Sequence, residues 1–430
     1  MKIALLGYGV EGASAYRYFT RLYPEAAFEI YDNAESPKYD IPAGVTLKSG
    51  MKDFHDIDAD LVIKTPAIAP SKVSTRGEVS SVTRTFFDVC PVPIIGVTGT
   101  KGKGTTSTLT ANMLSKAGIK TWLVGNIGVA ALDKIEEIEQ AHVAGEPCVV
   151  IYELSSFQLW DMTKSPQVAV VLMIEPEHLN VHKDFEEYVE AKSNIVKYQH
   201  ADDVAIYYAD NAVSRSIGEK SPGKKMPYVI EEGPRLSVDG RVLVDKNDII
   251  LYGDHNVGNV QAAMIAAWQF TQDRDAIQAA VREFSGLPHR LEPVITTRED
   301  VLFINDSFSS APPAAVAAVR AFAQPKIVIM GGFDRGLDFT ETARNIAAQP
   351  NLKKVLLIGQ TRQVIAEAFE ACGWHGYEVI DGPLDDAVAR ANELAVSGDA
   401  VILSPGCASF DMFSDFNVRG NAFKELVKRL

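Results

Sequence analysis

The sequence has little cysteine, no basic excess and no long apolar run. Its four cysteines, Cys90, Cys148, Cys372 and Cys407, are widely spaced and form no CxxC or zinc pattern, so reduced thiols are expected. Acidic residues outnumber basic ones by 56 to 42, a net charge of −14, which argues against a broad nucleic-acid-binding surface. No apolar stretch approaches the roughly 20 residues that span a bilayer. We therefore expect neither a nucleic-acid partner nor a membrane partner.

The first twelve residues form a short apolar segment that superficially looks like a signal sequence. This segment has no cleavage site and leads directly into a glycine pattern, so it is interpreted as a buried strand. A cytoplasmic location is the expectation that follows.

The 430 residues are enough for two or three domains. Strand-like and helix-like segments alternate along the chain, which predicts α/β domains with parallel sheets. The proline-containing stretch Cys90–Pro93 and the stretch Gly286–Arg290 interrupt this alternation and are interpreted as linkers. The predicted domains are residues 1–91, 92–286 and 287–430. The segment Gly218–Asp248, rich in charge and glycine, is interpreted as a β-hairpin excursion of the middle domain.

Apolar runs and their periodicity place the expected elements. The expected strands of the first two domains are Lys2–Leu6, Phe28–Asp32, Leu61–Lys64, Ile94–Val97, Cys148–Tyr152 and Val168–Ile174. The expected helices there are Glu11–Leu22, Thr105–Ala117 and Phe185–Tyr198. The expected strands of the third domain are Val301–Asn305, Lys326–Met330, Lys354–Ile358 and Ala400–Leu403.

A glycine-rich turn follows the first predicted strand. Gly7, Gly9 and Gly12 form a GxGxxG pattern, and Asp32 follows Gly12 by 20 residues. This spacing is typical of a dinucleotide fingerprint, in which backbone amides and a helix N-terminus hold a pyrophosphate. Many βα turns need the same glycines for tight packing alone, so a bound phosphate and a purely structural turn both stay open. A nucleotide-sugar diphosphate suits this geometry as well as NAD does.

A second glycine-rich loop lies between a predicted strand and a predicted helix. Its residues are Gly99, Thr100, Lys101, Gly102, Lys103, Gly104 and Thr105. Glycines let backbone amides converge on phosphate oxygens and Lys103 adds a point charge, so the loop predicts binding of a triphosphate. The strict P-loop pattern fails twice, because Val97 stands at the first glycine position and Gly104 at the Ser/Thr that normally holds magnesium. Thr105 or Thr106 is the candidate replacement for that hydroxyl.

Polar residues follow two further strands of the middle domain. Glu153 comes directly after Cys148–Tyr152, at the edge where α/β sheets bind ligands and where nucleotide-bound magnesium needs an acidic ligand. It fits a helix cap equally well. His178 follows Val168–Ile174 among carboxylates, either as a metal ligand or as a hydrogen-bonded structural histidine. Lys192 lies on the next predicted helix, where a solvated helix face is the ordinary interpretation.

The remaining motifs flank the second linker and the strands of the third domain. Asn256 and Asn259 follow Asp254 at the start of a helix, where they fit a ligand site or an N-cap. Arg290, in the linker, either reaches a γ-phosphate or holds the linker in place. Three loops at strand ends predict a ligand crevice in the third domain, and they contain Asn305-Asp306-Ser307, Gly331–Arg335 and Ser404–Phe410.

Taken together, these motifs resemble the Mur ligase family, most closely its MurD type. The resemblance runs from LLGYGVEG to FNVRGNAFKELV and rests on the order and spacing of GVTGTKGK, GNIG, YELSSFQL, EHLN, HNxxN, GLPHR, NDS and SPGCAS. It implies a Rossmann-like N-terminal domain for the UDP end of the substrate, a P-loop ATPase-like central domain for ATP and magnesium, and a Rossmann-like C-terminal domain for the incoming amino acid. It also implies an ATP-dependent ligase of peptidoglycan synthesis that adds glutamate to UDP-N-acetylmuramoyl-L-alanine through an acyl phosphate, with D-glutamate as the family default. A monomer is expected.

The resemblance further implies roles for individual residues. The catalytic residues are Lys103, His178 and Lys192, and Lys192 matches the family's carbamoylated lysine. The magnesium ligands are Glu153, His178, Lys192 and Thr105. ATP is held by the loop from Gly99 to Thr105 and by Asn256, Asn259, Arg290 and Asp306. The contacts to the substrates are Gly9, Asp32, Asn126, Ser155 and Gln158 for the nucleotide sugar, and Arg335, Ser409, Phe410 and Phe416 for glutamate.

Two departures from the family pattern concern the amino acid. The lysine that usually follows NDS is missing, and the chain continues through Phe308, Ser309 and Ser310. Arg335 stands where the family often has a lysine and is the candidate substitute cation. Both loops look closer to the divergent branch that adds L-glutamate, so the handedness of the glutamate stays open.

Three other functions fit parts of the sequence. Folylpolyglutamate synthase shares the ATP domain and adds glutamate, but it lacks the N-terminal βα domain. A nicotinamide dehydrogenase built on the first glycine turn leaves the middle domain unexplained. A non-catalytic nucleotide-binding regulator is suggested by Gly104 in the phosphate loop. If Arg290 and Asp306 contact a nucleotide held by the middle domain, the third domain must swing about the linker.

Overall fold

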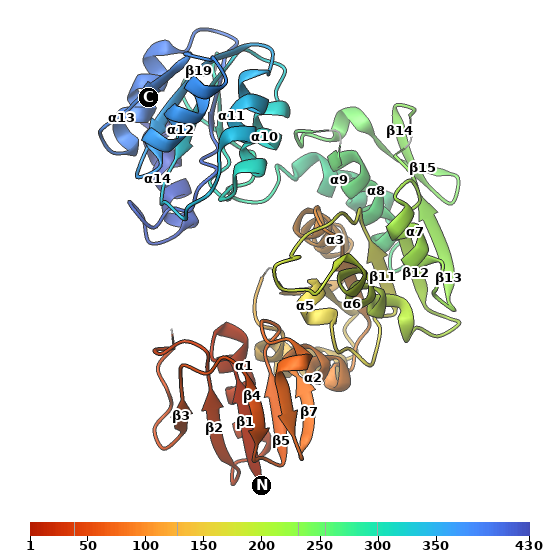
Figure 1. Cartoon of the computed structure of the whole chain (residues 1–430). Coiled ribbons are helices and arrows are strands. Elements are labelled where there is room, and N and C mark those ends of the chain that lie inside the picture. The colour runs from red at the N-terminus through yellow and green to blue at the C-terminus, as the bar shows by residue number, and fades with distance from the viewer. Residues whose placement is uncertain (38, 127, 231, 254, 299) are drawn as a thin grey trace. The chain divides into compact units, whose positions relative to one another are not determined.

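The structure is a computed structural model that describes residues 1–37, 39–126, 128–230, 232–253, 255–298 and 300–430 (Figure 1). The chain divides into two units, Met1–Ile249 with His255–Glu283 and Ile250–Asp254 with Phe284–Leu430. The first unit contains two large sheets and the second contains one. These three sheets with their helices confirm the α/β fold class, and the domain boundaries at 91/92 and 286/287 stay predictions. Within the described ranges, no helix is long and apolar enough to cross a membrane.

The N-terminal sheet, red to orange in Figure 1, has five parallel strands in the order β3-β2-β1-β5-β7. Its strands are β1 (Lys2–Leu6), β2 (Ala27–Tyr31), β3 (Thr46–Lys48), β5 (Leu61–Lys64) and β7 (Glu78–Ser81), with helices α1 (Val10–Leu22) and α2 (Val82–Val89). A small pair, β4 (Phe54–Ile57) and β6 (Val73–Thr75), and a 3₁₀ turn η1 (Pro70–Lys72) complete it. The strand expected at Phe28–Asp32 ends at Tyr31, because the Asp32 carboxylate accepts the backbone N–H groups of Tyr8 and Ala34 and begins a turn.

The central sheet has six parallel strands in the order β13-β12-β11-β8-β10-β9. Its strands are β8 (Ile94–Thr98), β9 (Lys120–Gly125), β10 (Cys148–Glu153), β11 (Val168–Val171), β12 (Val204–Tyr208) and β13 (Lys224–Tyr228). Its helices are α3 (Lys103–Lys116), α4 (Ile135–Val143), α5 (Ser156–Leu159), α6 (Phe185–Lys197), α7 (Ala212–Gly218), α8 (His255–Trp268) and α9 (Arg274–Glu283), with 3₁₀ turns η2 (Ala131–Lys134) and η3 (Lys246–Asp248). β8, β10 and β11 are buried throughout or nearly so, as expected for strands covered on both faces.

Two expectations for the central sheet were wrong. The strand predicted to reach Ile174 ends at Val171, because the Asn211 side chain takes up both the N–H and the carbonyl of Ile174. The segment predicted as a hairpin excursion supplies the edge strand β13 first, and only β14 (Arg235–Val238) and β15 (Arg241–Asp245) form an antiparallel hairpin. Buried Met226 and Tyr228 hold β13 in the main sheet.

The C-terminal sheet has six strands in the order β16-β17-β21-β18-β19-β20. Its strands are β16 (Glu292–Val294), β17 (Leu302–Asn305), β18 (Lys326–Gly331), β19 (Leu352–Ile358), β20 (Tyr377–Val379) and β21 (Ala400–Leu403). Its helices are α10 (Pro312–Arg320), α11 (Thr340–Ala347), α12 (Arg362–Ala371), α13 (Leu384–Leu394) and α14 (Phe416–Lys428). The expected parallel pairing holds for β17 to β21, and the short edge strand β16 pairs antiparallel with β17. The parallel strands bring the loops after β17, β18, β19 and β21 to one edge of this sheet.

Candidate functional site

The loop after β8 contains glycines that the structure requires. Gly102 has φ +86° and precedes α3, and a Cβ placed on it would lie 2.2 Å from Oδ1 of Asn259. A Cβ on Gly99 would lie 2.7 Å from Cβ of Leu172. Asn259 also donates from Nδ2 to Oδ1 of Asn256 at 2.8 Å. Asn259 of α8 therefore lies directly against the predicted phosphate loop and Asn256 contacts Asn259, whereas Asp254 falls outside the described residues.

Two lysines converge on one backbone oxygen of this loop. Nζ of Lys103 donates to the carbonyls of Gly99 and Thr100, both at 3.0 Å. Nζ of Lys192, from α6, donates to the same Gly99 carbonyl at 2.9 Å and to Thr98 Oγ1 at 3.2 Å. Burial, reinforced by the charge of Lys103, lowers the pKa of Lys192 well below its usual value. The ordinary interpretation of Lys192 as a solvated residue was wrong, since its side chain is fully buried.

Thr100 holds the loop to the segment after β11. Its backbone N–H donates to Met173 O at 2.8 Å, and its Oγ1 lies 3.0 Å from both Glu175 O and the hydroxyl of Tyr188. Burial raises the pKa of Tyr188 to about 12, so this phenol stays protonated. Thr105 lies in the first turn of α3, and the neighbouring Thr106 is buried with its Oγ1 lacking any partner in the described chain. Gly104 is buried and Lys101 is exposed.

Glu153 ends β10 with one carboxylate oxygen unsatisfied. Its Oε1 accepts a hydrogen bond from Nδ2 of Asn126 at 2.8 Å, whereas its buried Oε2 has no partner among the described residues. A buried carboxylate oxygen without a donor is the kind of group that a cation satisfies. The helix-cap interpretation of Glu153 was wrong, because Ser155 caps α5 and accepts the N–H of Gln158 through its Oγ at 3.3 Å.

His178 lies in a tight turn of the segment after β11. It has φ +58°, and its carbonyl accepts the N–H groups of Val181 and His182, both at 3.0 Å. Its imidazole is exposed and lies 5.0 Å from the ring of Phe157. Across the described ranges, no group of three or more His, Cys, Asp or Glu residues is placed to hold a metal by itself. The proposed ligand set contains only two such residues, Glu153 and His178, so their assignment stays a prediction.

The three glycines of the N-terminal turn differ in how closely other atoms pack against them. A Cβ on Gly7 would lie 2.3 Å from Thr65 Oγ1, and one on Gly12 would lie 2.1 Å from Gly7 O, whereas one on Gly9 would meet no atom of the described residues within 4 Å. Packing therefore explains the first and last glycines but not Gly9, which faces open space as a phosphate approach requires. Both carboxylate oxygens of Asp32 accept backbone N–H groups, from Tyr8 at 2.6 Å and Ala34 at 2.8 Å.

The C-terminal sheet gathers its predicted residues around two loops. Asp306 accepts hydroxyl groups of Ser309 at 2.5 Å and Ser404 at 2.7 Å, and the N–H of Leu291 at 3.2 Å. Burial raises the pKa of Asp306 to about 6. The guanidinium of Arg290 lies 3.7 Å from the ring centre of Phe308. Asp306 thus joins the two loops to the linker within its own unit.

Of the residues predicted to bind glutamate, Ser409 and Phe410 lie in the segment after β21, Phe416 begins α14, and Arg335 follows β18. Arg335 lies 5.7 Å from the ring centre of Phe410, which is 57% exposed. Ser409 is buried, and its carbonyl accepts Phe413 N at 2.8 Å. Phe416 packs edge-on against Phe308 at 5.0 Å.

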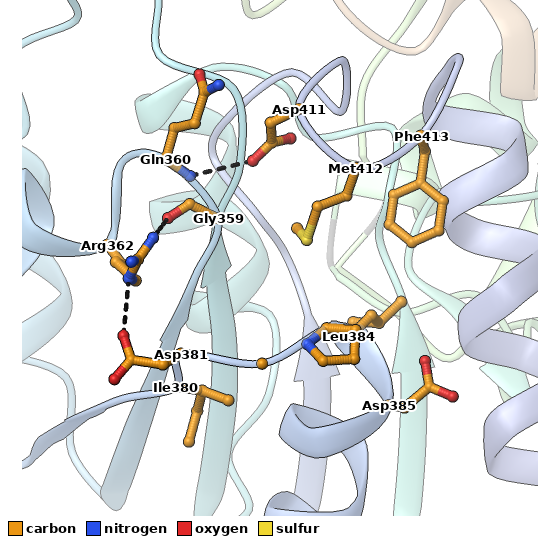
Figure 2. A pocket seen from close by; sticks show the side chains of 12 residues that line it. Gly359, Gln360, Arg362, Ile380, Asp381, Leu384, Asp385, Asp411, Met412 and Phe413 are labelled. Atoms are coloured by element: carbon orange, nitrogen blue, oxygen red, sulfur yellow. Dashed lines mark hydrogen bonds and ion pairs between the residues drawn. The ribbon is translucent and has the colours of Figure 1, made fainter.

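The same segment also borders a pocket of about 530 Å³, drawn in Figure 2. Arg362 and Asp381 lie together at one side of this pocket, 3.3 Å apart, with Met412 and Phe413 at the other side. Asp411 accepts the N–H of Gln360 at 3.1 Å (Figure 2). The sequence did not predict this pocket, because its lining comes from the ends of β19 and the short strand β20.

Sequence comparison with known proteins assigns the chain to a family. Residues 97–267 match the Mur ligase middle domain, and residues 289–407 match the Mur ligase, glutamate ligase domain. A UDP-N-acetylmuramoylalanine–D-glutamate ligase of Acetivibrio thermocellus is 36% identical, over 100% of this chain and 96% of that protein. A protein of the same name from Clostridium botulinum is 33% identical, over 100% and 97%. The chain belongs to the Mur ligase family. The resemblance stated from the motifs is therefore confirmed.

Solved structures share the fold of this Mur ligase. The UDP-N-acetylmuramate-alanine ligase MurC of Thermotoga maritima aligns with a TM-score of 0.58 at 17% identity, covering 99% of this chain and 98% of that one. The MurF ligase of Thermotoga maritima, solved in complex with ADP, aligns with a TM-score of 0.58 at 16% identity, covering 99% and 94%.

Sequence reasoning missed a buried histidine of this Mur ligase. His182 packs against the rings of Phe157, at 5.3 Å, and Trp160, at 4.3 Å, and its Nε2 lies 3.0 Å from Ser156 Oγ. Burial lowers the pKa of His182. The signal was its spacing of four residues from His178, which closes the turn described above.

A buried arginine was missed as well. Arg419 donates from Nε to Ser307 Oγ at 3.0 Å and from Nη2 to the carbonyls of Ser307 and Cys407 at 2.9 and 3.0 Å. Its Nη1 donates to Ala408 O at 3.1 Å. Burial lowers the pKa of Arg419 to about 10, which leaves it charged at neutral pH. Arg419 therefore ties the loops after β17 and β21 to α14.

Proposed function

We propose that this Mur ligase joins glutamate to UDP-N-acetylmuramoyl-L-alanine with conversion of ATP to ADP and phosphate, as a step of peptidoglycan synthesis. The observation that carries the proposal is the convergence of Lys103 and Lys192 on the Gly99 carbonyl, at the edge where β8 neighbours the strand ending in Glu153. Full-length relatives that bear the D-glutamate ligase name support this substrate pair.

The chemistry requires a carboxylate to become electrophilic. Transfer of the γ-phosphoryl group of ATP to the alanyl carboxylate gives an acyl phosphate and ADP. The glutamate amine then attacks the acyl carbon, a tetrahedral intermediate forms, and phosphate leaves as the amide forms. The protein contributes alignment and neutralisation of negative charge. Lys103 is the cation for the phosphate groups, supported by the N–H groups at the start of α3, which follows Gly102.

Magnesium fits the donors at this edge. Among the residues that the structure describes, Glu153 offers an unsatisfied buried oxygen, and Thr106 offers an unpartnered hydroxyl beside the Thr105 position that the sequence suggested. His178 completes the proposed set. When bound, magnesium neutralises phosphate charge at the transferred group.

Lys192 acts close to the same charges. Its lowered pKa favours the neutral amine, which is the form that adds carbon dioxide to give a carbamate and a released proton. The resulting anion would neutralise the neighbouring Lys103 and replace a neutral amine with a carboxylate-like metal ligand. This agrees with the carbamoylated lysine that the family resemblance implies.

The remaining residues divide by substrate. For the nucleotide sugar we assign Gly9, Asp32, Asn126, Ser155 and Gln158, supported by the open space before Gly9. For ATP we assign Asn256, Asn259, Arg290 and Asp306, supported by the contact of Asn259 with Gly102. For glutamate we assign Arg335, Ser409, Phe410 and Phe416. Arg335 beside exposed Phe410 is the cation for a glutamate carboxylate.

We further propose a cytoplasmic monomer whose two units close on nucleotide, which would appear as compaction in solution scattering.

The test is phosphate release from ATP with UDP-N-acetylmuramoyl-L-alanine, magnesium and either D- or L-glutamate. We expect release with D-glutamate that depends on all three substrates. Release with L-glutamate alone would assign the chain to the L-glutamate branch, as the altered loop after NDS suggests. No release with either would overturn the proposal. Polyglutamate extension of a folate would then support the folylpolyglutamate alternative, oxidation of NAD(P)H the dehydrogenase, and ATP binding without turnover the regulator.

A further inference from the structure

A glutamate stands inside the glycine turn that we assign to the UDP-linked substrate. Glu11 follows Gly9 by two residues, in the first turn of α1. Its Oε1 accepts a hydrogen bond from Nε2 of Gln158 at 3.1 Å. Its Oε2 is buried and has no partner in the described part of the chain. A carboxylate at the edge of a phosphate-binding turn opposes a diphosphate ligand by like charge, so its presence there calls for a function.

The partner of Glu11 is held in a fixed orientation. Oε1 of Gln158 accepts both the N–H and the Oγ hydroxyl of Ser155, at 2.9 and 3.0 Å. Because a backbone N–H is only a donor, the oxygen of the Gln158 amide must face Ser155 and its nitrogen must face Glu11. The turn after β1 is thereby linked to the segment after β10, both of which we assign to the same substrate.

A buried lysine completes the junction. Lys64, the last residue of β5, is 1% exposed, and its Nζ lies 3.2 Å from Oδ2 of Asp161. This ammonium makes no hydrogen bond of good geometry with the residues that the structure describes, and Oδ1 of Asp161 is likewise unpartnered. The next residue, Thr65, packs against Gly7 of the glycine turn. With Glu11 ionised, the three charges of the junction sum to −1, and with Glu11 neutral they cancel.

We propose that Glu11 is a proton-linked positioning residue for the UDP-linked substrate: its neutral acid form admits the diphosphate to the turn, and its ionised form repels it. This inference rests on the proposed function and concerns the regulation of that same site. Lys64 and its ion-pair partner Asp161 are the neighbouring groups that set the balance between the two forms; burial lowers the pKa of Lys64, and the adjacent Asp161 opposes this effect. Gln158 transmits the state of Glu11 to the segment that follows β10.

The groups around Glu11 allow its neutral and ionised forms to coexist near neutral pH. Burial raises the pKa of Glu11 to about 7, against the opposing effects of the Gln158 hydrogen bond and the charge of Lys64. The other titratable groups that face the junction are Asp161 and Tyr152. Burial raises the pKa of Tyr152, and the charge of Glu11 raises it further, so this phenol stays neutral throughout. A diphosphate close to Glu11 would raise the pKa of its carboxyl again, so binding takes up a proton.

The experiment measures KM for UDP-N-acetylmuramoyl-L-alanine, KM for ATP and kcat between about pH 6 and pH 9. For the unmodified protein, we expect KM for the nucleotide sugar to rise roughly tenfold between pH 6 and pH 8, with no parallel change in KM for ATP. Glu11→Gln, which keeps shape and hydrogen bonding but removes the charge, is expected to flatten this dependence. Glu25→Gln, on an exposed turn of the same sheet, is the matched control and should behave as the unmodified protein.

A second variant guards against a merely structural effect. Asp161→Asn removes a like charge from the junction, which favours the ionised form of Glu11 and should move the midpoint of the KM profile to lower pH. Calorimetric binding of UDP-N-acetylmuramoyl-L-alanine in two buffers of different ionisation heat should show proton uptake near pH 7.5, which Glu11→Gln abolishes.

The outcomes separate the two proposals. Binding with the same proton uptake and the same pH profile in Glu11→Gln would overturn this inference and leave the proposed function intact. A variant that changes kcat and both KM values equally at all pH values would show a structural role and would also overturn it. Failure of the unmodified protein to bind the nucleotide sugar at any pH would contradict the proposed function itself, and the inference with it.

Discussion

The two glycine-rich turns of the first unit look alike in sequence but are contacted by residues from different parts of the fold. The backbone of the turn after β1 is held by its own sheet, through Asp32 and Thr65, and Gly9 stays open, although Gln158 of α5 contacts Glu11 at the edge of the turn. The loop after β8 is completed from other elements, since Lys192 comes from α6 and Asn259 from α8. Glycine spacing therefore predicts a turn, whereas residues that arrive from elsewhere in the fold decide its chemistry. Substitutions on either side of this comparison should have unequal effects.

The largest expected effect comes from the phosphate loop. Lys103→Met should lower kcat roughly 10²–10³-fold, because it removes the cation that neutralises the transferred phosphoryl group. Lys116→Met, at the other end of α3, is the matched control, since Lys116 pairs with Glu283 at the surface. Steady-state phosphate release is the measurement. Equal activity of the two variants would contradict the assignment of Lys103.

The next largest effect concerns the second unit, where buried Arg419 is expected to contribute to stability and not to catalysis. Arg419→Met should destabilise that unit by about 3 kcal/mol, because three buried carbonyl acceptors lose their donor. Arg320→Met, which removes an exposed contact to Asn345, should change stability by less than about 0.5 kcal/mol. Chemical denaturation gives both values. A stability of Arg419→Met within error of its control would refute the role of this arginine.

A smaller effect distinguishes backbone strain at Gly102 from its contact with Asn259 in the phosphate loop. Gly102→Ala and Gly118→Ala both place a side chain at positive φ, +86° and +79°, which costs about 1–2 kcal/mol each. Only Gly102→Ala also strikes Asn259, whereas a Cβ on Gly118 meets nothing within 4 Å. We therefore expect KM for ATP to rise in Gly102→Ala alone. A similar rise in Gly118→Ala would mean that backbone strain, not Asn259, governs nucleotide binding.

The smallest effect is a dependence of stability on pH. The pKa of Asp306 is about 6 in the folded protein and about 3.9 in an unfolded chain. The folded state therefore binds a proton more readily, and stability falls as pH rises from about 4 to about 6. This group should account for a loss of about 1–2 kcal/mol across that interval, seen as the difference between the unmodified protein and Asp306→Asn in denaturant unfolding. A difference that does not vary with pH would show that Asp306 is not the titrating group.

Much of the fold was predictable because buried strands carry apolar runs bounded by turn residues. Leu61–Lys64 and Ala400–Leu403 agree with the structure to the residue. The short strands β16 and β20 were missed, because three residues give no periodicity and β16 contains Pro293. The middle segment was misjudged as a hairpin throughout, because local composition does not show that β13 pairs with β12.

The site was predictable only where its residues are adjacent in sequence. The phosphate loop and Glu153 follow strand ends, which spacing reveals. Lys192 was selected by family resemblance alone, because nothing in its helix signals that it contacts Gly99. His182 and Arg419 were missed, since each is a polar residue whose partners come from distant segments. The same reason hid Glu11 and Lys64.

The most direct test of the account is the mass of the product formed from UDP-N-acetylmuramoyl-L-alanine, ATP and magnesium when D-glutamate and isotopically labelled L-glutamate compete in one reaction. We predict one amide product, heavier than the nucleotide sugar by one unlabelled glutamate less water, in amounts equal to the ADP formed. ATP turnover without any gain in mass of the nucleotide sugar would contradict it.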